Sequence, residues 1–510
     1  MRITATGHAG LFLETTTGSV LCDPWRSPAY FESWFVFPDN SDVDFAAFKP
    51  DFLYISHLHR DHFDPELLAR DVPKSTTVLL PEFPTDELRT ALSDLGFHSF
   101  IETRNGVPID LDGLRVMITA MVSPSDGPIG DSALSLDDGG TRILDQNDAR
   151  PPEPSELKEF GAYDGHFLQF SGAIWWPVAY DLPEANRTEF ARRKRLNGME
   201  RARRFVEAVG AGYVFPTAGP PCFLDDDLFE HNDFANSPDN IFPDQSVFLS
   251  YLAEGGLDNG RLLIPGSTAV LTSRGCEVTH RLSRGEVQSI FEDKRPYLEA
   301  YAARQKPVIE RRRRSWPSYD GELLVALQEA FEPLLALADH ICEGVGAPVL
   351  LDLGKEKILV DFTARQVRGW AGEECRYRFT IDRRLVEALV AEHEIDWVNS
   401  LFLSMRFRAK RRGPYNEFVF AFFKCLSTER ISYVEGWYAE KSSSDELIRL
   451  GDYMVQRRCP HLKADLSRFG TVCDGVLECS MHGWRFDLGT RRCLTAEGHD
   501  IVAEPVERSG

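Results

Sequence analysis

The amino-acid sequence predicts a mixed α/β protein of about three domains, and three observations carry this prediction. The chain has 510 residues, and a domain takes roughly 150 residues. Residues 1 to about 300 alternate short apolar runs with helical patterns, which is typical of an α/β domain. The pattern then breaks at 303–318, where four arginines stand beside prolines. Hydrophobic residues make up 43% and charged residues 27% of the chain, as in ordinary globular proteins.

The first predicted domain covers residues 1–305. Its expected strands are short apolar runs separated by Gly, Asp and Pro. They read LFLET, SVLCD, DFLYISH, TTVLLP, RVMITAMV and RILDQ. Helical patterns appear at 86–96 and, more clearly, at about 187–209.

A basic linker is expected between the first and second domains. The run Arg311–Arg314 lies in RQKPVIERRRRSWPSYDG, which favours a linker or an exposed edge. A run of this kind serves either as a docking patch for phosphate or an acidic redox partner, or simply as a solvated charged surface. The sequence leaves both interpretations open.

The middle domain is predicted over residues 306–428 with an α+β fold. An amphipathic helix at 322–341 precedes the expected strands PVLLDLG, KILVDFT and RYRFTID. A second helix is expected at about 383–403, followed by apolar strands near 416–424. This order of elements faintly resembles the sterol-carrier-type fold, and the resemblance implies no chemistry.

The last domain, 429–510, contains two short loops that each offer one thiolate and one imidazole. Cys459 and His461 precede a gap of 17 residues, and Cys479 and His482 follow it. Two thiolates and two neutral imidazoles in this arrangement suit a [2Fe–2S] cluster, with one iron bound by each pair. Structural zinc is the alternative, although zinc sites usually group Cys with Cys and His with His. The spacing and the following HGWRFD run resemble the Rieske family, which implies a small all-β domain.

The Rieske-like segment lacks the extra cysteine pair of high-potential members. Ala464 and Ser480-Met481 stand at the equivalent places. The segment therefore resembles the lower-potential oxygenase and ferredoxin type. Cys473 and Cys493 are expected to be ordinary buried thiols. Because the cluster moves one electron at a time and little chain follows it, a catalytic metal is expected upstream.

A second metal motif lies in the first domain, directly after the apolar run FLYI. Its ligand candidates are His57, His59, Asp61 and His62. On an extended segment His57 and His59 point the same way, while Asp61 and His62 address a second metal. Two metals a few Å apart can activate an oxygen species between them. This motif resembles the first signature of the metallo-β-lactamase family, which implies an αββα fold. The segments around His8 and Asp23 resemble one subgroup, which implies that both residues line or support the site.

Later motifs of that family are altered here. No His occurs between 99 and 165, so Asp126 and Asp131 are the available groups for the third motif. Asp148, after RILDQ, best fills the bridging-carboxylate position. The fifth motif also lacks a His, and Asp225–Asp227 and His231 are the nearby substitutes. Exchanging His for carboxylate favours iron over zinc, although zinc stays possible.

Both motifs together resemble the CMP-N-acetylneuraminate hydroxylase family, which joins a Rieske domain to a metallo-β-lactamase-like domain. The similar stretches include DPWRSPAYFESW, RILDQNDARP, QFSGAIWWP and YVFPTAGPP. The order is reversed in this chain, whose Rieske-like part is C-terminal. The resemblance implies a hydroxylase that uses O2 and an external electron donor: a ferredoxin, a cytochrome b5-like protein or a reductase.

The expected function is therefore that of a Rieske-dependent monooxygenase with a mono- or dinuclear iron site. His57, His59, Asp61, His62 and Asp148 are expected to be catalytic, with Asp131 and His231 as further metal ligands. The substrate is a small molecule or a carrier-bound group. The segment 163–180, with its two tryptophans, is either a wall of the substrate pocket or a hydrophobic clamp. Two other functions stay open: a metal-dependent hydrolase or lactonase with a redox-sensing Rieske domain, and a non-catalytic electron-transfer protein.

Charge and hydropathy exclude several partners. The formal net charge is −22, which disfavours nucleic acid and anionic membranes because both need a basic surface. No run of about 18 apolar residues predicts a transmembrane helix. The N-terminal stretch lacks the pattern of a signal peptide. A cytoplasmic location without disulfides is therefore expected.

Overall fold

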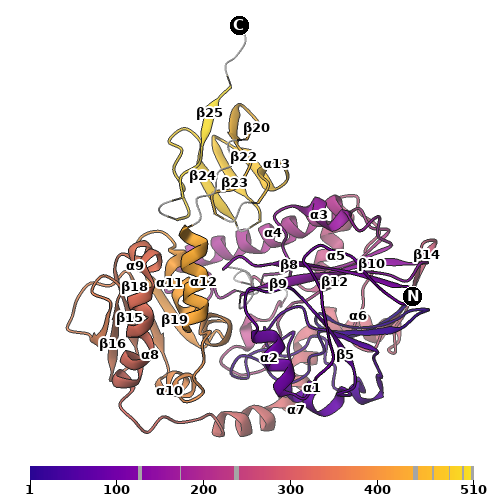
Figure 1. The fold of residues 1–510 in the computed structure, drawn as a ribbon, viewed down its shortest axis with the longest axis horizontal. Coiled ribbons are helices and arrows are strands. Elements are labelled where there is room, and N and C mark those ends of the chain that lie inside the picture. The colour runs from indigo at the N-terminus through magenta and orange to yellow at the C-terminus, as the bar shows by residue number, and fades with distance from the viewer. Residues whose placement is uncertain are drawn as a thin grey trace. The chain divides into compact units, whose positions relative to one another are not determined.

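The computed structural model of the protein describes residues 1–124, 129–172, 174–234, 240–439, 446–461, 464–481, 483–496 and 499–506 (Figure 1). The chain forms two compact units. Unit 1 comprises Met1–Val122, Asp126–Ala173 and Ala191–Arg313, and unit 2 comprises Ser123–Ser125, Ile174–Phe190 and Arg314–Gly510. The predicted boundaries at 305 and 428 stay a prediction.

Unit 1 contains two sheets. The first has the strand order β14-β13-β1-β2-β3-β4-β5-β6, and the second has the order β12-β11-β10-β9-β8-β7. The strands of the first sheet are β1 (Arg2–Gly7), β2 (Gly10–Glu14), β3 (Ser19–Cys22), β4 (Phe52–Tyr54), β5 (Thr77–Leu80), β6 (Phe100–Glu102), β13 (Thr268–Thr272) and β14 (Gly275–Thr279). Those of the second are β7 (Ile109–Leu111), β8 (Leu114–Met121), β9 (Asp131–Asp137), β10 (Arg142–Asn147), β11 (Gly165–Gln169) and β12 (Tyr213–Thr217).

The two sheets of unit 1 pack face to face between two layers of helices. One buried core joins side chains of both sheets, such as Leu13 of β2 and Ile118 of β8. The outer face of the first sheet packs on α1 (Pro65–Asp71) and α2 (Glu87–Asp94). The outer face of the second packs on α3 (Pro154–Lys158) and on Val209 of α4 (Glu184–Val209). This is the αββα arrangement of a metallo-β-lactamase-like fold, and all six expected strands are present.

Further helices follow the last strands of unit 1 or lie beside them. They are α5 (Gln245–Glu254), α6 (Arg284–Glu292) and α7 (Lys294–Arg314). The basic linker predicted at 303–318 lies at the boundary between the two units, which falls between Arg313 and Arg314. Its first part is helical, because α7 continues to Arg314 through Pro307. Buried Leu298, Tyr301 and Ile309 anchor this helix in a core with Phe35 and Leu224. Arg312 and Arg313 form ion pairs with Glu66 and Asp225, so tertiary packing outweighs the break suggested by proline.

Unit 2 begins with a five-stranded sheet in the order β17-β16-β15-β18-β19. These strands are β15 (Pro348–Asp352), β16 (Lys357–Asp361), β17 (Gln366–Gly369), β18 (Tyr377–Ile381) and β19 (Phe407–Arg411). The helices are α8 (Leu323–Leu337), α9 (Asp339–Val345), α10 (Arg383–Ala391), α11 (Glu417–Lys424) and α12 (Thr428–Ala439), with one π-helical turn at Val398–Phe402.

Two expectations for this α+β part are corrected. The apolar run near 416–424 is not strand but helix α11, whose first turn is capped by Asn416 through a 3.3 Å bond from the Val419 amide. The expected single helix at 383–403 is interrupted between α10 and the π-helical turn. The helix at 322–341 likewise divides at Ala338 into α8 and α9. Trp175 packs on Phe402 and Phe420 in the core of unit 2, which favours the clamp interpretation of segment 163–180.

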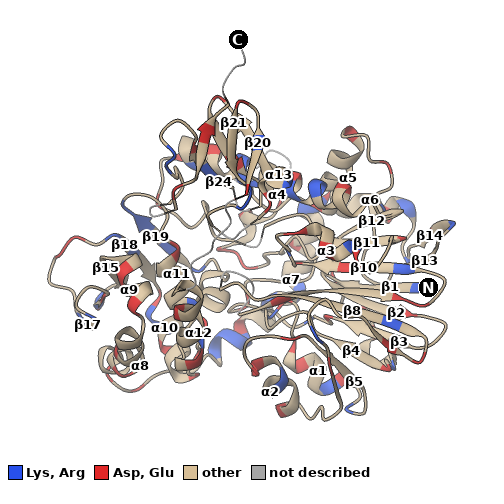
Figure 2. Ribbon diagram, turned by 45° about the horizontal axis from the view of Figure 1, so that its top comes forward, with Lys and Arg blue, Asp and Glu red and all other residues tan. Residues whose placement is uncertain are grey.

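The C-terminal part of unit 2 consists of two small sheets. One has the order β20-β21-β25 and the other β22-β23-β24. The strands are β20 (Leu447–Leu450), β21 (Tyr453–Gln456), β22 (Gly470–Cys473), β23 (Val476–Cys479), β24 (Trp484–Asp487) and β25 (Ala503–Pro505), with one turn of helix, α13 (Leu466–Phe469). Acidic and basic residues are interspersed over both units (Figure 2). Within the described residues, no helix is both long and apolar enough to cross a bilayer.

A buried histidine in the second sheet makes unit 1 acid-sensitive. His166 of β11 is 0% exposed, and its Nε2 lies 2.8 Å from Oε1 of Gln146. Burial lowers the pKa of His166 to about 3. The unfolded chain binds a proton near pH 6.5 and the folded chain does not, so stability falls as the pH drops through this interval. Between pH 7 and pH 5 the expected loss of unfolding free energy is about 2 kcal/mol.

His166→Gln should flatten this pH dependence of the unfolding free energy in denaturant titrations. His98→Gln, at an exposed site, should leave it intact, and equal slopes for H166Q and wild type would contradict the assignment.

Candidate metal centre and cluster site

The His57–His62 motif forms the loop between β4 and α1. The amides of His62 and Phe63 both donate to the carbonyl oxygen of His59, at 2.9 and 2.7 Å. Asp64 caps α1 by accepting from the Leu67 amide at 3.0 Å, and its other oxygen accepts from the amides of Arg26 and Ser27. The loop is therefore fixed at its C-terminal end, which holds its imidazoles in defined directions.

Two imidazoles of the loop converge as the alternation of an extended segment predicts. Nε2 of His57 lies 2.7 Å from Nδ1 of His59. Nδ1 of His57 faces Oγ of Ser56 at 2.9 Å and Oδ1 of Asp131 at 3.3 Å. Burial, followed by the neighbouring histidines His62 and His59, lowers the pKa of His57 well below its usual value. The neutral imidazole is the form that binds metals.

His62 is oriented by a carboxylate on its far side. Its Nδ1 lies 2.8 Å from Oδ2 of Asp23, and Asp23 also accepts from the amide and hydroxyl of Ser56. Nε2 of His62 faces Oδ1 of Asp148 at 3.6 Å and Oδ2 of Asp61 at 3.9 Å. A carboxylate on one ring nitrogen sets the tautomer and orientation of a metal-binding His. Asp23 thus supports His62, and Asp148 follows the end of β10, where the sequence predicts the bridging carboxylate.

Asp61 is held between two partners from other loops. Nε2 of His8 lies 2.9 Å from its Oδ2, and the hydroxyl of Tyr30 donates to its Oδ1. Burial alone would raise the pKa of Asp61, but His62 and His8 hold it well below its usual range. Asp61 is therefore a carboxylate and a competent metal ligand.

The donor atoms gather into two overlapping groups that fit a metal. His8, Asp61 and His62 form one, and His57, His62 and Asp148 form the other, each with its donor atoms within 4.8 Å of one another. Among the described residues, the buried atoms Nε2 of His62 and Oδ1 of Asp148 have no hydrogen-bond partner. Leaving such atoms unsatisfied costs about 1–3 kcal/mol each, and a cation between them removes that cost. His8 joins the set, although the sequence offered only its Gly-His-Ala turn as a signal.

The residues predicted to replace the third and fifth metal motifs differ in position. Asp131 lies next to the donor groups, and those at 225, 226 and 231 have other partners. Asp131 begins β9 and contacts His57. Neither donor group includes His59 or His231. His59 contacts His57, whereas the ring of His231 packs against Phe223. Asp225 pairs with Arg313, and Asp226 lies 3.6 Å from Lys306. Asp126 lies outside the described residues.

The second site lies in the small sheets of unit 2. Cys459 follows β21 and Cys479 ends β23, and both are buried. The ring of His461 stacks on Trp484 with 3.8 Å between centroids. His482 lies outside the described residues. Two buried thiols and an imidazole fit the thiolate and histidine ligands of a [2Fe–2S] cluster. Two other thiols were expected to be buried. Cys473 is exposed, because it stands at the hairpin turn between β22 and β23. Cys493 is half-buried.

Glu417, the first residue of α11, contacts two histidines near this site. Its oxygens lie 3.2 Å from Nε2 of His461 and 3.2 Å from Nε2 of His499. Burial opposes ionisation, but hydrogen bonds from both histidines lower the pKa of Glu417 to about 2. Because Glu417 occupies Nε2 of His461, a metal would be bound through Nδ1. The sequence pattern does not reveal this contact, because it predicts a strand at 416–424.

Glu417→Gln is expected to raise the reduction potential of the cluster. The substitution removes a negative charge beside a ligand, and hydrogen bonds and charge at the ligands set Rieske potentials. The expected shift is upward, on the order of tens of millivolts, measured by spectroelectrochemical titration. Glu429→Gln, at an exposed site of α12, should not move the potential. A shift of equal size in both variants, or a downward shift in E417Q, would contradict the role of Glu417.

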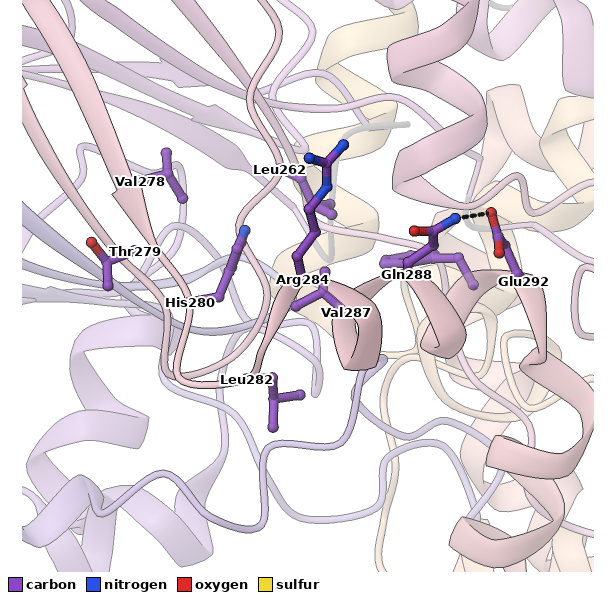
Figure 3. Close-up of a pocket in the computed structure, with 10 residues that line it drawn as sticks. Leu262, Val278, Thr279, His280, Leu282, Arg284, Val287, Gln288 and Glu292 are labelled. Atoms are coloured by element: carbon purple, nitrogen blue, oxygen red, sulfur yellow. Dashed lines mark hydrogen bonds between the residues drawn. The ribbon is translucent and has the colours of Figure 1, made fainter.

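A surface pocket in unit 1 is lined by residues that belong to neither site. It has a volume of about 700 Å³ and is formed by β14 and α6 (Figure 3). Its lining includes Leu262, His280, Arg284 and Phe291. Gln288 and Glu292 bond to each other at its rim, at 2.7 Å. None of the described residues that line this pocket is a predicted metal or cluster ligand. The size of a pocket therefore does not identify the reactive site.

Comparison with known families confirms the two parts of unit 2. Residues 323–440 match the family described as "Rv3818-like, SCP2-like domain", so the sterol-carrier-like prediction is correct. Residues 448–504 match the Rieske [2Fe-2S] domain, which confirms the prediction of a C-terminal Rieske domain.

One curated relative matches almost the full chain. "Putative Rieske 2Fe-2S iron-sulfur protein Rv3818" of Mycobacterium tuberculosis (strain ATCC 25618 / H37Rv) is 49% identical, covering 98% of this chain and 99% of the relative. Solved structures similar to this chain include a metallo hydrolase from Ignicoccus hospitalis, with 19% identity, TM-score 0.35, and 55% and 99% of the two chains covered. CmlA, a diiron β-hydroxylase from Streptomyces venezuelae, has 19% identity, TM-score 0.36, and 55% and 54% covered.

Proposed function

Because the chain belongs to the family of the mycobacterial Rieske 2Fe-2S iron–sulfur protein that it matches over its full length, we propose that it is a Rieske-dependent oxygenase. It hydroxylates a small-molecule or carrier-bound substrate with O2, at a mono- or dinuclear iron site in unit 1. The observation that carries the proposal is the presence, in one chain, of a Rieske domain and a separate buried histidine–carboxylate donor set. A hydrolase has no use for an electron relay, whereas reductive O2 activation needs one.

Each site has a defined set of protein ligands under this proposal. Cys459, His461, Cys479 and His482 hold the cluster, which supplies single electrons. His57, His59, Asp61, His62 and Asp148 hold the catalytic iron, with His8 as an additional donor. Asp131 positions His57 rather than binding metal. His231, which packs on Phe223, has no role in this assignment.

The remaining residues of the site orient the donors and exclude water. Asp23 fixes Nδ1 of His62, and Tyr30 donates to Asp61. Tyr30, Asp23 and Trp25 are buried, and burial strengthens each electrostatic contact among them. Burial, together with Asp61, raises the pKa of Tyr30 well above its usual value, so its hydroxyl keeps its proton and remains a donor.

A metal-dependent hydrolase or lactonase with a redox-sensing Rieske domain is the second candidate. The observation in its favour is that His57, His59 and His62 supply the nitrogen ligands that zinc also accepts. The two candidates differ in their need for reductant. Hydrolysis of esters or phosphodiesters without reductant supports the hydrolase, and reductant-dependent O2 uptake supports the oxygenase.

Metal analysis with EPR on the full chain tests the proposal directly. The expected result is iron beyond the two atoms of the cluster, and O2 consumption when a ferredoxin, a cytochrome b5-like protein or a reductase supplies electrons. Zinc alone in unit 1, with no O2 uptake by the reduced protein, would overturn it.

A further inference from the structure

Three basic side chains lie near the end of β10 in unit 1, and two of them, Arg150 and Arg201, interact with Asp148. Arg150 stands two residues after Asp148, beyond the end of β10, and Lys194 and Arg201 lie on α4. Their charges act on one another: Arg201 and Arg150 act on Lys194, and Arg150 and Asp148 act on Arg201. Arg150 also acts on Asp148. We call Arg150, Lys194 and Arg201 the cation cluster.

The geometry of α4 explains why two of these residues point the same way. Lys194, Gly198 and Arg201 are spaced by four and three residues, so they share one face of the helix. At Gly198 this face lies against the segment after β11, since a side-chain carbon there would stand 3.4 Å from the carbonyl oxygen of Phe170 and 3.9 Å from the Gly172 amide.

Arg150 is tied to the same place from the sheet side. Its Nη2 donates to Oε1 of Gln169, the last residue of β11. The strands β10 and β11 are parallel, so their C-terminal ends meet at one edge of the sheet, where Asp148 also lies. The helix face and the strand ends therefore bring the cation cluster to the metal centre.

One member of the cation cluster is deeply buried, and the other two are half-buried. Arg201 is only 5% exposed. Burial, followed by the charges of Arg201 and Arg150, lowers the pKa of Lys194 to about 7. Like charges are costly at buried positions. The carboxylate of Asp148 attracts Arg201 and also faces His62.

Other arginines on α4 show the contrasting, structural arrangement. Arg195 binds Asp233 through both terminal nitrogens, at 2.9 and 2.8 Å. Arg203 binds both oxygens of Glu200 at 2.8 Å. These pairs neutralise charge within the fold. The cation cluster instead brings three basic side chains from two elements to the edge of the candidate metal centre, where Arg150 and Arg201 interact with Asp148.

We propose that Arg150, Lys194 and Arg201 bind an anionic group of the substrate, a carboxylate or a phosphate, beside the metal centre. This inference rests on the proposed function in one respect, that the anion belongs to a substrate. Binding of the anion itself does not require O2 chemistry. Two guanidinium groups and one ammonium suit such a group, because guanidinium binds paired oxygens and ammonium adds a compact charge. The bound anion compensates the charges that burial otherwise penalises and holds the substrate near Asp148.

Anion titration by calorimetry tests the inference on the full-length, metal-loaded protein. The probes are inorganic phosphate and propionate, and the stronger of the two identifies the class of anion. Lys194→Gln and Arg150→Gln, both at half-buried sites, are each expected to weaken binding of the preferred probe about tenfold or more. Arg192→Gln removes the same charge from an exposed site on the other side of α4 and should bind like wild type. Circular dichroism of each variant confirms its fold.

Two results would overturn the inference. One is unchanged affinity in both K194Q and R150Q. The other is binding that disappears in His57→Ala but survives in K194Q, since the anion would then be bound by the metal. Absence of O2 consumption, with anion binding that still depends on Lys194, would remove the oxygenase proposal and leave the anion site standing.

Discussion

Alanine in place of Cys459 is expected to leave the chain without its [2Fe–2S] cluster and to abolish reductant-dependent O2 consumption. The thiol is buried, 1% exposed, and one thiolate is half of the cysteine ligation of its iron. The visible absorption and EPR signal of the cluster should disappear, and iron should fall by about two atoms per chain. Activity should fall at least about a thousandfold, since removing a whole catalytic component typically costs this much.

Two controls make the Cys459 prediction specific. Cys473→Ala removes an exposed thiol from the same domain and should change neither the cluster nor activity. The unit 1 metal should remain in Cys459→Ala, because its candidate ligands belong to the other unit. Full O2 consumption by a cluster-free Cys459→Ala protein would end the oxygenase proposal, and full hydrolytic activity would favour the second candidate.

His62→Ala is expected to empty the metal centre of unit 1 while leaving the cluster spectra unchanged. His62 belongs to both donor groups, so its loss weakens each. Removing residues that merely orient a ligand lowers metal affinity 10- to 100-fold, and removal of the ligand itself should exceed about 100-fold. Metal content after dialysis and O2 uptake measure the effect.

The control for the His62 prediction is another histidine of unit 1. His98 is exposed, and His98→Ala should keep both metal and activity. Asp23→Asn offers a graded intermediate, because it leaves the candidate metal donors in place and weakens the contact to Nδ1 of His62. Retention of the unit 1 metal in His62→Ala would show that the donor set is misassigned.

The sequence predicted those elements whose pattern is local. The six expected strands of unit 1 alternate with turn residues and were placed correctly. The strand prediction for residues 416–424 was wrong, because a short apolar run suits a buried strand or a buried helix equally. The deciding signal was Asn416, a preferred residue at the start of helices, and it was available in the sequence. Pro307 suggested a break where the structure has a continuous helix, because the core around Leu298 and Ile309 keeps α7 helical.

For the candidate site, spacing in the sequence predicts which side chains lie together when they share one segment, but not when they come from distant segments. The histidines at 57, 59 and 62 lie on one loop, and Asp148 follows a recognisable strand. The cation cluster joins Arg150 to residues 44 and 51 positions later, and only packing of α4 on the strand ends reveals it. Glu417 is similarly distant from His461. Contacts of this kind depend on tertiary structure, which a single sequence does not display.

The position of Glu417 has a practical consequence for dissecting the protein. The segment that matches the Rieske domain starts at 448, and a truncated chain beginning there would look complete by sequence. Such a fragment would lose the acceptor that engages His461 and His499 and would open a buried imidazole to water. Fragments for spectroscopy should therefore start upstream of α11, and potentials measured on shorter ones would belong to the fragment rather than to the protein.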